Sequence, residues 1–388
     1  MQLPRPFVIV THVVNNAVIK GFIPAAQTLG YDVLLLTDHG KSHAAVLDHQ
    51  VNIAECDVFN PLAILDTLTA MGLSPVALFS NSDHLQTATA IAASALNLPG
   101  KNWQICYAAK EKLRMRQRLQ KLGLPSTWSK QWLPGSSIEQ NWPYPLVVKP
   151  SQGVASMDVS RVDNADSLQH LIKQSARHEA LLLESFIEGE LFTLETLGDG
   201  TDLIAVGGFD VELAEPPFFI EKQARWQGKQ AQQWQAQALE QVRQFGVGFG
   251  VCHSEFIATD NGPVLVEINY RSIGDGREFL LDRLLPQGWF SPILQLHLGQ
   301  GLPQIQAHTE QALVHYLIAE RDGVLKQAPV IPELDGLHYH PLKQAGDRIH
   351  LTHSNKDYLG VLYLQAANDE TLRSLSQNTL ARLEWEIA

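Results

Sequence analysis

The sequence predicts an α/β fold divided into several domains, and three observations indicate it. Apolar runs typical of buried strands alternate with helical patterns from residue 7 to residue 96, as expected of a parallel sheet. A strong hairpin signal lies far downstream, within residues 250–277. The chain has 388 residues, which suffices for two or three domains with ample cores.

The composition narrows the classes of protein. Hydrophobic residues make up 45% and charged residues 18%, as in soluble globular proteins. A net charge of −12 argues against a broad surface for nucleic acid or anionic membrane. Cys56, Cys106 and Cys252 form no C-x-x-C motif, and no run approaches the roughly 18 apolar residues of a membrane span. We therefore expect a cytoplasmic protein with neither nucleic-acid nor membrane partners.

The first unit, residues 1–105, carries the alternating pattern. Strands are expected at 7–11, 32–37, 51–56 and 75–79, with helices at 16–29, 62–71 and 85–96. Thr11-His12 and Ser80–Asp83 follow strands, at the edge where open α/β sheets bind ligands. Asp83 is expected to be a helix cap rather than a ligand. The unit lacks G-x-G-x-x-G, so no dinucleotide site is predicted.

A candidate phosphate-binding stretch lies in the second unit, residues 106–190. Its basic helix at 110–122 should mostly face solvent, with Lys112 singled out near the helix start. A strand at 144–150 carries Lys149, and the small-residue loop Ser151–Ser156 leads to a strand at 157–162. Backbone N–H groups of such a loop can approach a phosphate while the lysine adds charge. The alternative is an ordinary hairpin.

Glu184 stands inside the apolar run at 181–186, which predicts a buried strand. A buried carboxylate is costly unless it is paired or hydrogen-bonded. Glu184 is therefore expected either to meet a cation such as Lys149 or to face a ligand pocket. A helix at 166–177 precedes this strand, and two further strands are expected at 191–197 and 203–211.

The hairpin within residues 250–277 predicts a metal site. A three-residue loop Asp260-Asn261-Gly262 would set Glu255 opposite Glu267, whereas a two-residue Asn-Gly turn would set Glu255 opposite Ile268. With the three-residue loop, Asn269 shares the face of both carboxylates. Like charges placed opposite each other need compensation, and oxygen ligands of this kind suit Mg²⁺. Two unrelated glutamates on a solvated face are the alternative.

Several other residues leave two interpretations open. The loop at 216–221 is expected on the substrate side, where Glu221 would contact an amine or a second metal, or would lie free on the surface. Arg277 would bind a substrate carboxylate or pair with Asp275 or Asp282.

The remaining elements follow in order. A glutamine-rich helix is expected at 230–245 and a helical stretch from 277 to about 299. A smaller α/β unit at 306–388 would hold strands at 312–317, 347–352 and 358–365 and a last helix at 370–383. His338, His340, His350 and His353 match no metal-ligand spacing and are expected to be structural or surface residues.

Together these motifs resemble the ATP-grasp superfamily, in particular its carboxylate–amine ligases that form amides or dipeptides. The family's K-x-x-M-R-x-x-L-x-x-x-G-x-P pattern appears as Lys112, Met115, Arg116, Leu119, Gly123 and Pro125. Its V-V-K-P motif contains Lys149, and its E-x-Y-I-x-G-x-E hinge runs from Glu184 to Glu190, with Phe186 in place of tyrosine. Its H-x-E…E-x-N-x-R segment matches His253, Glu255, Glu267, Asn269 and Arg271.

The resemblance implies a fold and a reaction. The fold would be a Rossmann-like domain at 1–105, an ATP-grasp nucleotide-binding subdomain at 106–190, a catalytic and metal subdomain at 191–305, and a small α/β unit at 306–388. The reaction would join a small-molecule carboxylate to an amine through an acyl phosphate, consuming ATP with Mg²⁺ or Mn²⁺. Dimers are common among proteins of this resemblance.

The resemblance also implies residue roles. Lys112, Lys149, Ser151 and Ser156 would hold the phosphates. Glu184, Phe186 and Ile187 would hold adenine, and Glu190 the ribose. Glu255, Glu267 and Asn269 would bind the metal, while Lys149 and Arg271 act in catalysis. The substrates would be bound by Glu221, His253, Arg271, Gly274 and Arg277.

Two alternatives accompany this hypothesis. One is a ligase of siderophore or other secondary-metabolite assembly that joins an amino acid to a polycarboxylate. The other is an ATP-binding sensor without catalysis, against which the intact acidic pair and Arg271 argue.

Overall fold

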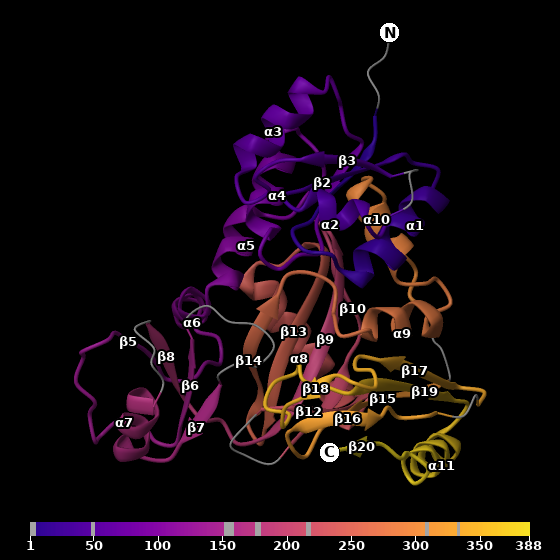
Figure 1. Ribbon diagram of the computed structural model, residues 1–388. Helices are drawn as coiled ribbons and strands as arrows, with labels where there is room; N and C mark the ends of the chain where they lie inside the picture. Colours follow the sequence, from indigo (N-terminus) through magenta and orange to yellow (C-terminus); the bar gives the residue numbers. More distant parts are fainter. Residues whose placement is uncertain are drawn as a thin grey trace.

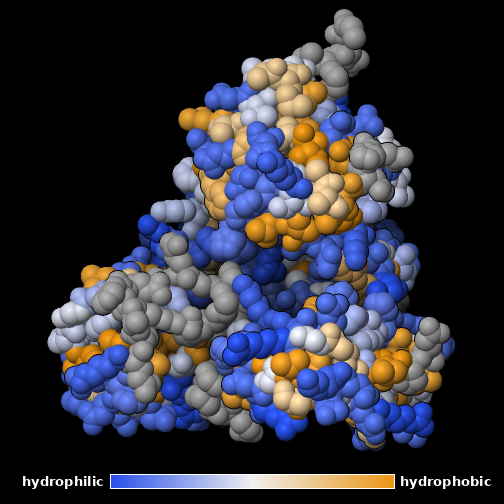
Figure 2. Space-filling view, in the orientation of Figure 1, coloured by the Kyte–Doolittle hydropathy of each residue, from blue (hydrophilic) through white to orange (hydrophobic). Residues whose placement is uncertain are grey.

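The computed structural model describes residues 5–47, 51–150, 159–174, 180–214, 219–306, 310–331 and 334–388. The N-terminal unit lies at the top of Figure 1, a small sheet with α7 at the lower left, and a large sheet below the N-terminal unit. Figure 2 shows a hollow between these parts, with hydrophilic residues at its centre and hydrophobic residues along its upper edge. The predicted loop residues Ser151 and Ser156 and the loop residues 216–218 lie outside the described residues.

The N-terminal unit contains the predicted parallel sheet. Its strands are ordered β3-β2-β1-β4. Phe7 and Ile9 of β1 pack in the same cluster as Phe22 and Phe290, while Val8 and Val10 pack with Leu68 and Ala92 on the other face. Both faces of the strand are therefore covered, which explains its continuous apolar run. The elements are β1 (Phe7–Val10), η1 (Ala17–Phe22), α1 (Ile23–Thr28), β2 (Val33–Thr37), α2 (Gly40–Ala44), β3 (Asn52–Glu55), α3 (Pro61–Ala70), β4 (Ala77–Phe79), α4 (Gln86–Ala95) and α5 (Trp103–Lys110).

A four-stranded antiparallel sheet ordered β5-β8-β6-β7 follows the basic helix. Glu184 on β8 lies beside Val147 of β6 and Ser129 of β5, so its carboxylate starts from an inner strand of this sheet. The elements are α6 (Lys112–Lys121), β5 (Ser129–Trp132), β6 (Leu146–Pro150), β7 (Ser160–Val162), α7 (Ala165–Gln174) and β8 (Leu181–Ser185).

The large sheet runs in the order β14-β13-β9-β11-β12-β15-β19-β17, with β10 paired to β9. Two sequence expectations are corrected here. The single strand expected at 203–211 is two strands, separated at Gly207-Gly208. Gly207 has φ of +156°, and a side chain at Gly208 would clash with the Thr193 carbonyl, so the chain can turn out of the strand only at this pair of glycines. Glu221 begins strand β12 rather than ending a loop. The strands are β9 (Glu190–Asp199), β10 (Leu203–Gly207), β11 (Phe209–Leu213), β12 (Glu221–Trp226), β13 (Phe249–Thr259), β14 (Gly262–Asn269), β15 (Gln311–Leu317), β17 (Leu337–Pro341) and β19 (Gly360–Ala366).

The C-terminal strands continue this large sheet, since β12 pairs with β15 and β15 with β19. The helical stretch expected from 277 to about 299 is two helices, because Pro286 and Gly288 interrupt it. α10 then packs against the N-terminal unit through β4 and α1. The remaining elements are α8 (Lys229–Phe245), α9 (Arg277–Leu284), α10 (Phe290–His297), β16 (Gly323–Gln327), β18 (Arg348–Ile349), α11 (Asp369–Leu380) and β20 (Glu386–Ile387).

Candidate active site

The β13–β14 hairpin places Glu255 opposite Glu267, as predicted, but by a different route. Thr259 pairs with Gly262, so the loop contains only Asp260 and Asn261. A β-bulge then makes Val266 an extra residue on β14, which shifts the register by one and brings Glu267 opposite Glu255. The predicted three-residue loop is therefore wrong, and the predicted carboxylate pair is confirmed.

Two cations offset the repulsion between these carboxylates. Lys112 Nζ lies 2.6 Å from Glu267 Oε1, and His253 Nε2 lies 3.5 Å from Glu255 Oε1. The other ring nitrogen of His253 lies 2.7 Å from Glu195 Oε1. Burial opposes a charge on His253, but Glu195 and Glu255 outweigh it and raise the pKa of His253 to about 9. The imidazole is therefore cationic at neutral pH.

Glu184 is the centre of a second charged cluster, and both predicted interpretations of it hold. Its side chain is only 6% exposed, yet it lines a cavity. Lys149 Nζ lies 2.6 Å from Glu184 Oε2, and Arg116 Nε lies 2.6 Å from Oε1. Burial disfavours its charge, but Lys149 and Arg116 prevail and lower the pKa of Glu184 to about 2. The buried carboxylate is thus held ionised by two cations.

Arg116 connects this cluster to the hairpin. Besides Glu184, its guanidinium donates to the Leu265 carbonyl at 2.9 Å and to the Val266 carbonyl at 2.7 Å. Val266 is the bulged residue, whose carbonyl has left the regular ladder. Sequence reasoning placed most cations of α6 in solvent and missed this role. The available signal was the four-residue spacing of Met115 and Leu119, which marks the buried face of the helix next to Arg116.

These groups line one cavity of about 300 Å³ between the small sheet and the hairpin. Its lining includes Arg116, Lys149, Glu184, Phe186, Ile187, Phe219, Glu221, His253, Glu255, Glu267, Asn269, Arg271, Gly274 and Arg277. Most of the predicted site residues are thus brought together. Glu190 is not among the lining residues; it is exposed on β9 and hydrogen-bonds the Gln230 side chain. Lys112 reaches the site through Glu267.

Arg277 and Glu221 form a buried pair on the far side of this cavity. Arg277 lies 3.1 Å from Glu221 Oε2 and 3.7 Å from Asp275 Oδ2. Asp282 instead accepts hydrogen bonds from the Trp289 and Phe290 amides. Burial works against the charge on Arg277, but Glu221 outweighs it and raises its pKa. Glu221 is therefore a buried residue and not the free surface glutamate of the alternative.

A second cavity, of about 510 Å³, adjoins the first and shares Asp275 and Asn355 with it. Glu278 lines this cavity and is buried, and its Oε2 has no hydrogen-bond partner among the described residues. Burial raises the pKa of Glu278 to about 7. Sequence reasoning missed this residue, because a glutamate in the first turn of a helix is ordinarily explained by the helix dipole.

Comparison with known proteins identifies the fold of the site. Residues 109–275 match the protein family described as ATP-grasp domain. The chain carries an ATP-grasp domain. It is 21% identical to the uncharacterized protein y4rH of Sinorhizobium fredii, over 95% of this chain and 80% of that protein. It is 25% identical to dapdiamide A synthase of Enterobacter agglomerans, over 80% of each chain.

A solved structure of L-amino acid ligase from Bacillus licheniformis superposes with a TM-score of 0.77, at 18% identity, covering 99% of each chain. This likeness confirms the predicted α+β ATP-grasp fold along the whole chain. Together with the sequence relatives, the domain match identifies an ATP-dependent ligase. Among the described residues, no helix is long and apolar enough to cross a membrane.

Proposed function

We propose that this ATP-grasp ligase joins a small-molecule carboxylate to an amine, converting ATP to ADP and phosphate through an acyl phosphate. The observation that carries the proposal is the cavity that Glu255, Glu267 and Asn269 of the hairpin share with Lys149 of the small sheet and with Arg271. A carboxylate of the substrate would attack the γ-phosphorus of ATP, and an amine would then displace phosphate from the acyl carbon. Such transfer depends mainly on positioning and on stabilising charge.

The donor atoms of the hairpin suit Mg²⁺, with Mn²⁺ as the alternative. Glu255, Glu267 and Asn269 present two carboxylates and an amide oxygen on facing strands, which is a hard-oxygen set. When bound, the ion would neutralise charge on the phosphate oxygens. Lys112 is hydrogen-bonded to Glu267. To contact the phosphates, this lysine would turn from the carboxylate toward the nucleotide.

The remaining residues have roles that follow from their places in the cavity. Lys149 and Arg271 line it and would supply positive charge to the phosphoryl group and the substrate carboxylate. Phe186 and Ile187 line its other end, beside Phe219 at a ring distance of 6.4 Å from Phe186, and would hold adenine between apolar groups. Glu190, which lies on the surface beside Gln230, would have to reach the ribose from outside the cavity.

The second cavity is where the amine would bind. It adjoins the first at Asp275 and Asn355, so an amine there would lie next to the acyl phosphate. Glu278 contributes a buried carboxylate oxygen without a partner, which can accept a hydrogen bond from an ammonium group. A carboxylate whose pKa burial raises to about 7 can also take the proton that the amine must lose before it attacks.

Replacing Glu278 by glutamine is therefore expected to lower kcat/KM for the amine by about 100-fold, the contribution of a modest general base. The KM for ATP should stay the same, because Glu278 lies outside the nucleotide cavity. Steady-state kinetics with each substrate varied in turn measures both values. An equal loss for ATP and amine would show that Glu278 only supports the fold, and unchanged amine kinetics would remove it from the reaction.

A product screen tests the proposed function as a whole. The purified chain, incubated with ATP and Mg²⁺ and mixtures of amino acids and organic acids, should release ADP only when an acid and an amine are both present. If the protein bound ATP but released no ADP with any of the mixtures, it would be a sensor and not a ligase.

A further inference from the structure

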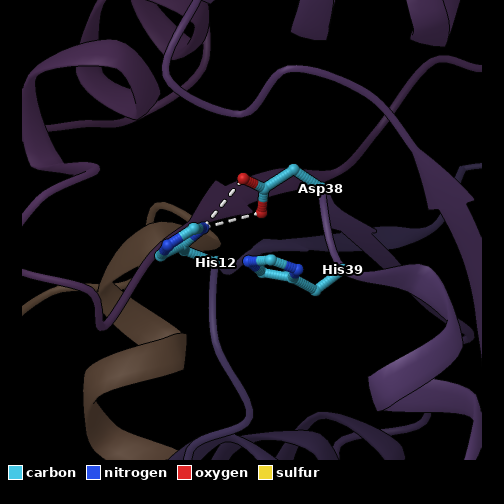
Figure 3. A group of neighbouring side chains, drawn as sticks. All are labelled: His12, Asp38 and His39. Atoms are coloured by element: carbon cyan, nitrogen blue, oxygen red, sulfur yellow. Dashed lines mark hydrogen bonds and ion pairs between the residues drawn. The ribbon is translucent and has the colours of Figure 1, made fainter.

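A cluster of metal-ligating side chains lies outside the ligase site, at the carboxyl edge of the N-terminal sheet. His12 follows β1, and Asp38 and His39 follow the neighbouring strand β2, so the parallel order brings them together (Figure 3). One donor atom from each of the three lies within 4.8 Å of the others. Among the described residues, this is the one group of three or more His, Cys, Asp or Glu side chains that meets that spacing.

His12 lies in direct contact with Asp38 and beside His39. Its Nδ1 lies 2.8 Å from both carboxylate oxygens of Asp38. An ion bound here would replace this hydrogen bond, with Nδ1 of His12 and one oxygen of Asp38 as neighbouring ligands. The His39 ring lies 4.7 Å from the His12 ring between centroids, tilted by 46°. Figure 3 shows the two imidazoles side by side beneath the carboxylate.

Two neighbouring side chains, one buried and one exposed, hold this arrangement in place. Thr37 is fully buried, and its hydroxyl donates to the His12 carbonyl at 3.2 Å and accepts from the His39 amide at 3.0 Å. The Phe59 ring packs edge-on against the His12 ring at 5.0 Å. The side chains of His12 and Asp38 remain 29% and 27% exposed. The cluster is therefore held in place by Thr37 and Phe59, and its donor atoms are accessible to an ion from solvent.

We propose that His12, Asp38 and His39 form a binding site for a divalent transition metal of the zinc type. Two imidazoles suit zinc, whereas Mg²⁺ prefers oxygen ligands, so this site and the hairpin differ in the metal they select. Tetrahedral zinc holds its donors about 3.3 Å apart, which small side-chain rotations would reach from a spread of 4.8 Å. Three protein ligands leave one position for water or a substrate atom.

The location suggests what the fourth position could serve. Val14 to Ala17, which follow His12 after one residue, line the second cavity. The cluster therefore lies on the side of the N-terminal unit that faces the ligase site, where it would act on the substrate side rather than on ATP.

The test titrates Zn²⁺ into chelator-treated full-length protein, with Mg²⁺ in excess to occupy the oxygen site. Calorimetry should show one zinc site per chain, and Co²⁺ in its place should give a visible absorption band. His39→Ala should weaken zinc binding by at least 10-fold and remove the band, since loss of even a supporting group costs 10- to 100-fold. Circular dichroism checks that the variant is folded, and His12→Gln provides a second test.

The matched control is His353→Ala. His353 is also exposed and lies 3.6 Å from an aspartate, Asp357, but it belongs to no three-donor group within the described residues. This variant should bind zinc like the wild type. Absence of zinc binding by the wild type, or equal affinity in the wild type and His39→Ala, would show that the cluster is only a histidine–aspartate ion pair. The readout needs no ligase activity, so it is independent of the proposed function.

Discussion

Replacing Glu267 by alanine is expected to abolish ATP turnover and to leave the fold intact. Glu267 is one of the two facing carboxylates of the hairpin, and it forms an ion pair with Lys112. Under the proposed function, the metal would lose one of its oxygen ligands and the phosphates would lose their main counter-charge. Removal of a single preorganised charged contact costs 100- to 1,000-fold in turnover, and loss of the ion should cost more.

The fold should tolerate this change because the Glu267 side chain is 32% exposed and its ion pair with Lys112 is partly solvated. ADP release and thermal unfolding measure the two effects. The matched control is Glu240→Ala on α8, where an exposed glutamate pairs with Arg243 far from the cavity; it should keep full activity. Wild-type turnover in the Glu267 variant would remove the hairpin from the reaction.

The second large effect is expected at Arg116, on stability. Alanine there would leave the buried Glu184 with Lys149 alone and would orphan the carbonyls of Leu265 and Val266. Removing one partner of a buried ion pair costs roughly 3–5 kcal/mol, because the other charge stays buried. Because Lys149 remains, we expect a value near the lower end, about 3 kcal/mol.

Urea unfolding measures this loss. Arg114→Ala is the matched control, since Arg114 lies on the same helix, is exposed, and stacks on the Tyr107 ring. Its substitution should change the free energy of unfolding by less than about 1 kcal/mol. If both variants unfolded at the same urea concentration, Arg116 would not be what ties the small sheet to the hairpin.

The candidate site could be predicted in outline because its residues belong to continuous strands. Alternating side chains on β13 and β14 place Glu255, Glu267 and Asn269 on one face once the register is known. The predicted pairing of Glu255 with Glu267 was correct, although the predicted loop length was not. The loop has two residues, and the bulge at Val266 shifts the register by the one residue that restores this pairing. A bulge of this kind depends on what meets its free carbonyl, here Arg116 from a distant helix.

Other features depended on contacts that local patterns do not contain. The pairing of β12 with β15, which extends the large sheet into the C-terminal residues, joins segments about ninety residues apart. Glu278 looks like a favourable first-turn residue of α9, and only its burial beside the second cavity distinguishes it. His12 and His39 also lie far apart in sequence, and the parallel pairing of β1 with β2 brings them together.

The central claim is phosphoryl transfer to a carboxylate, and an isotope measurement tests it most directly. The acid that supports ADP release would be supplied with ¹⁸O in its carboxylate, and the products examined by ³¹P NMR and mass spectrometry. An acyl phosphate intermediate predicts ADP together with inorganic phosphate that carries one ¹⁸O from the acid. AMP carrying the label, with pyrophosphate as the second product, would contradict the account and replace it with adenylation.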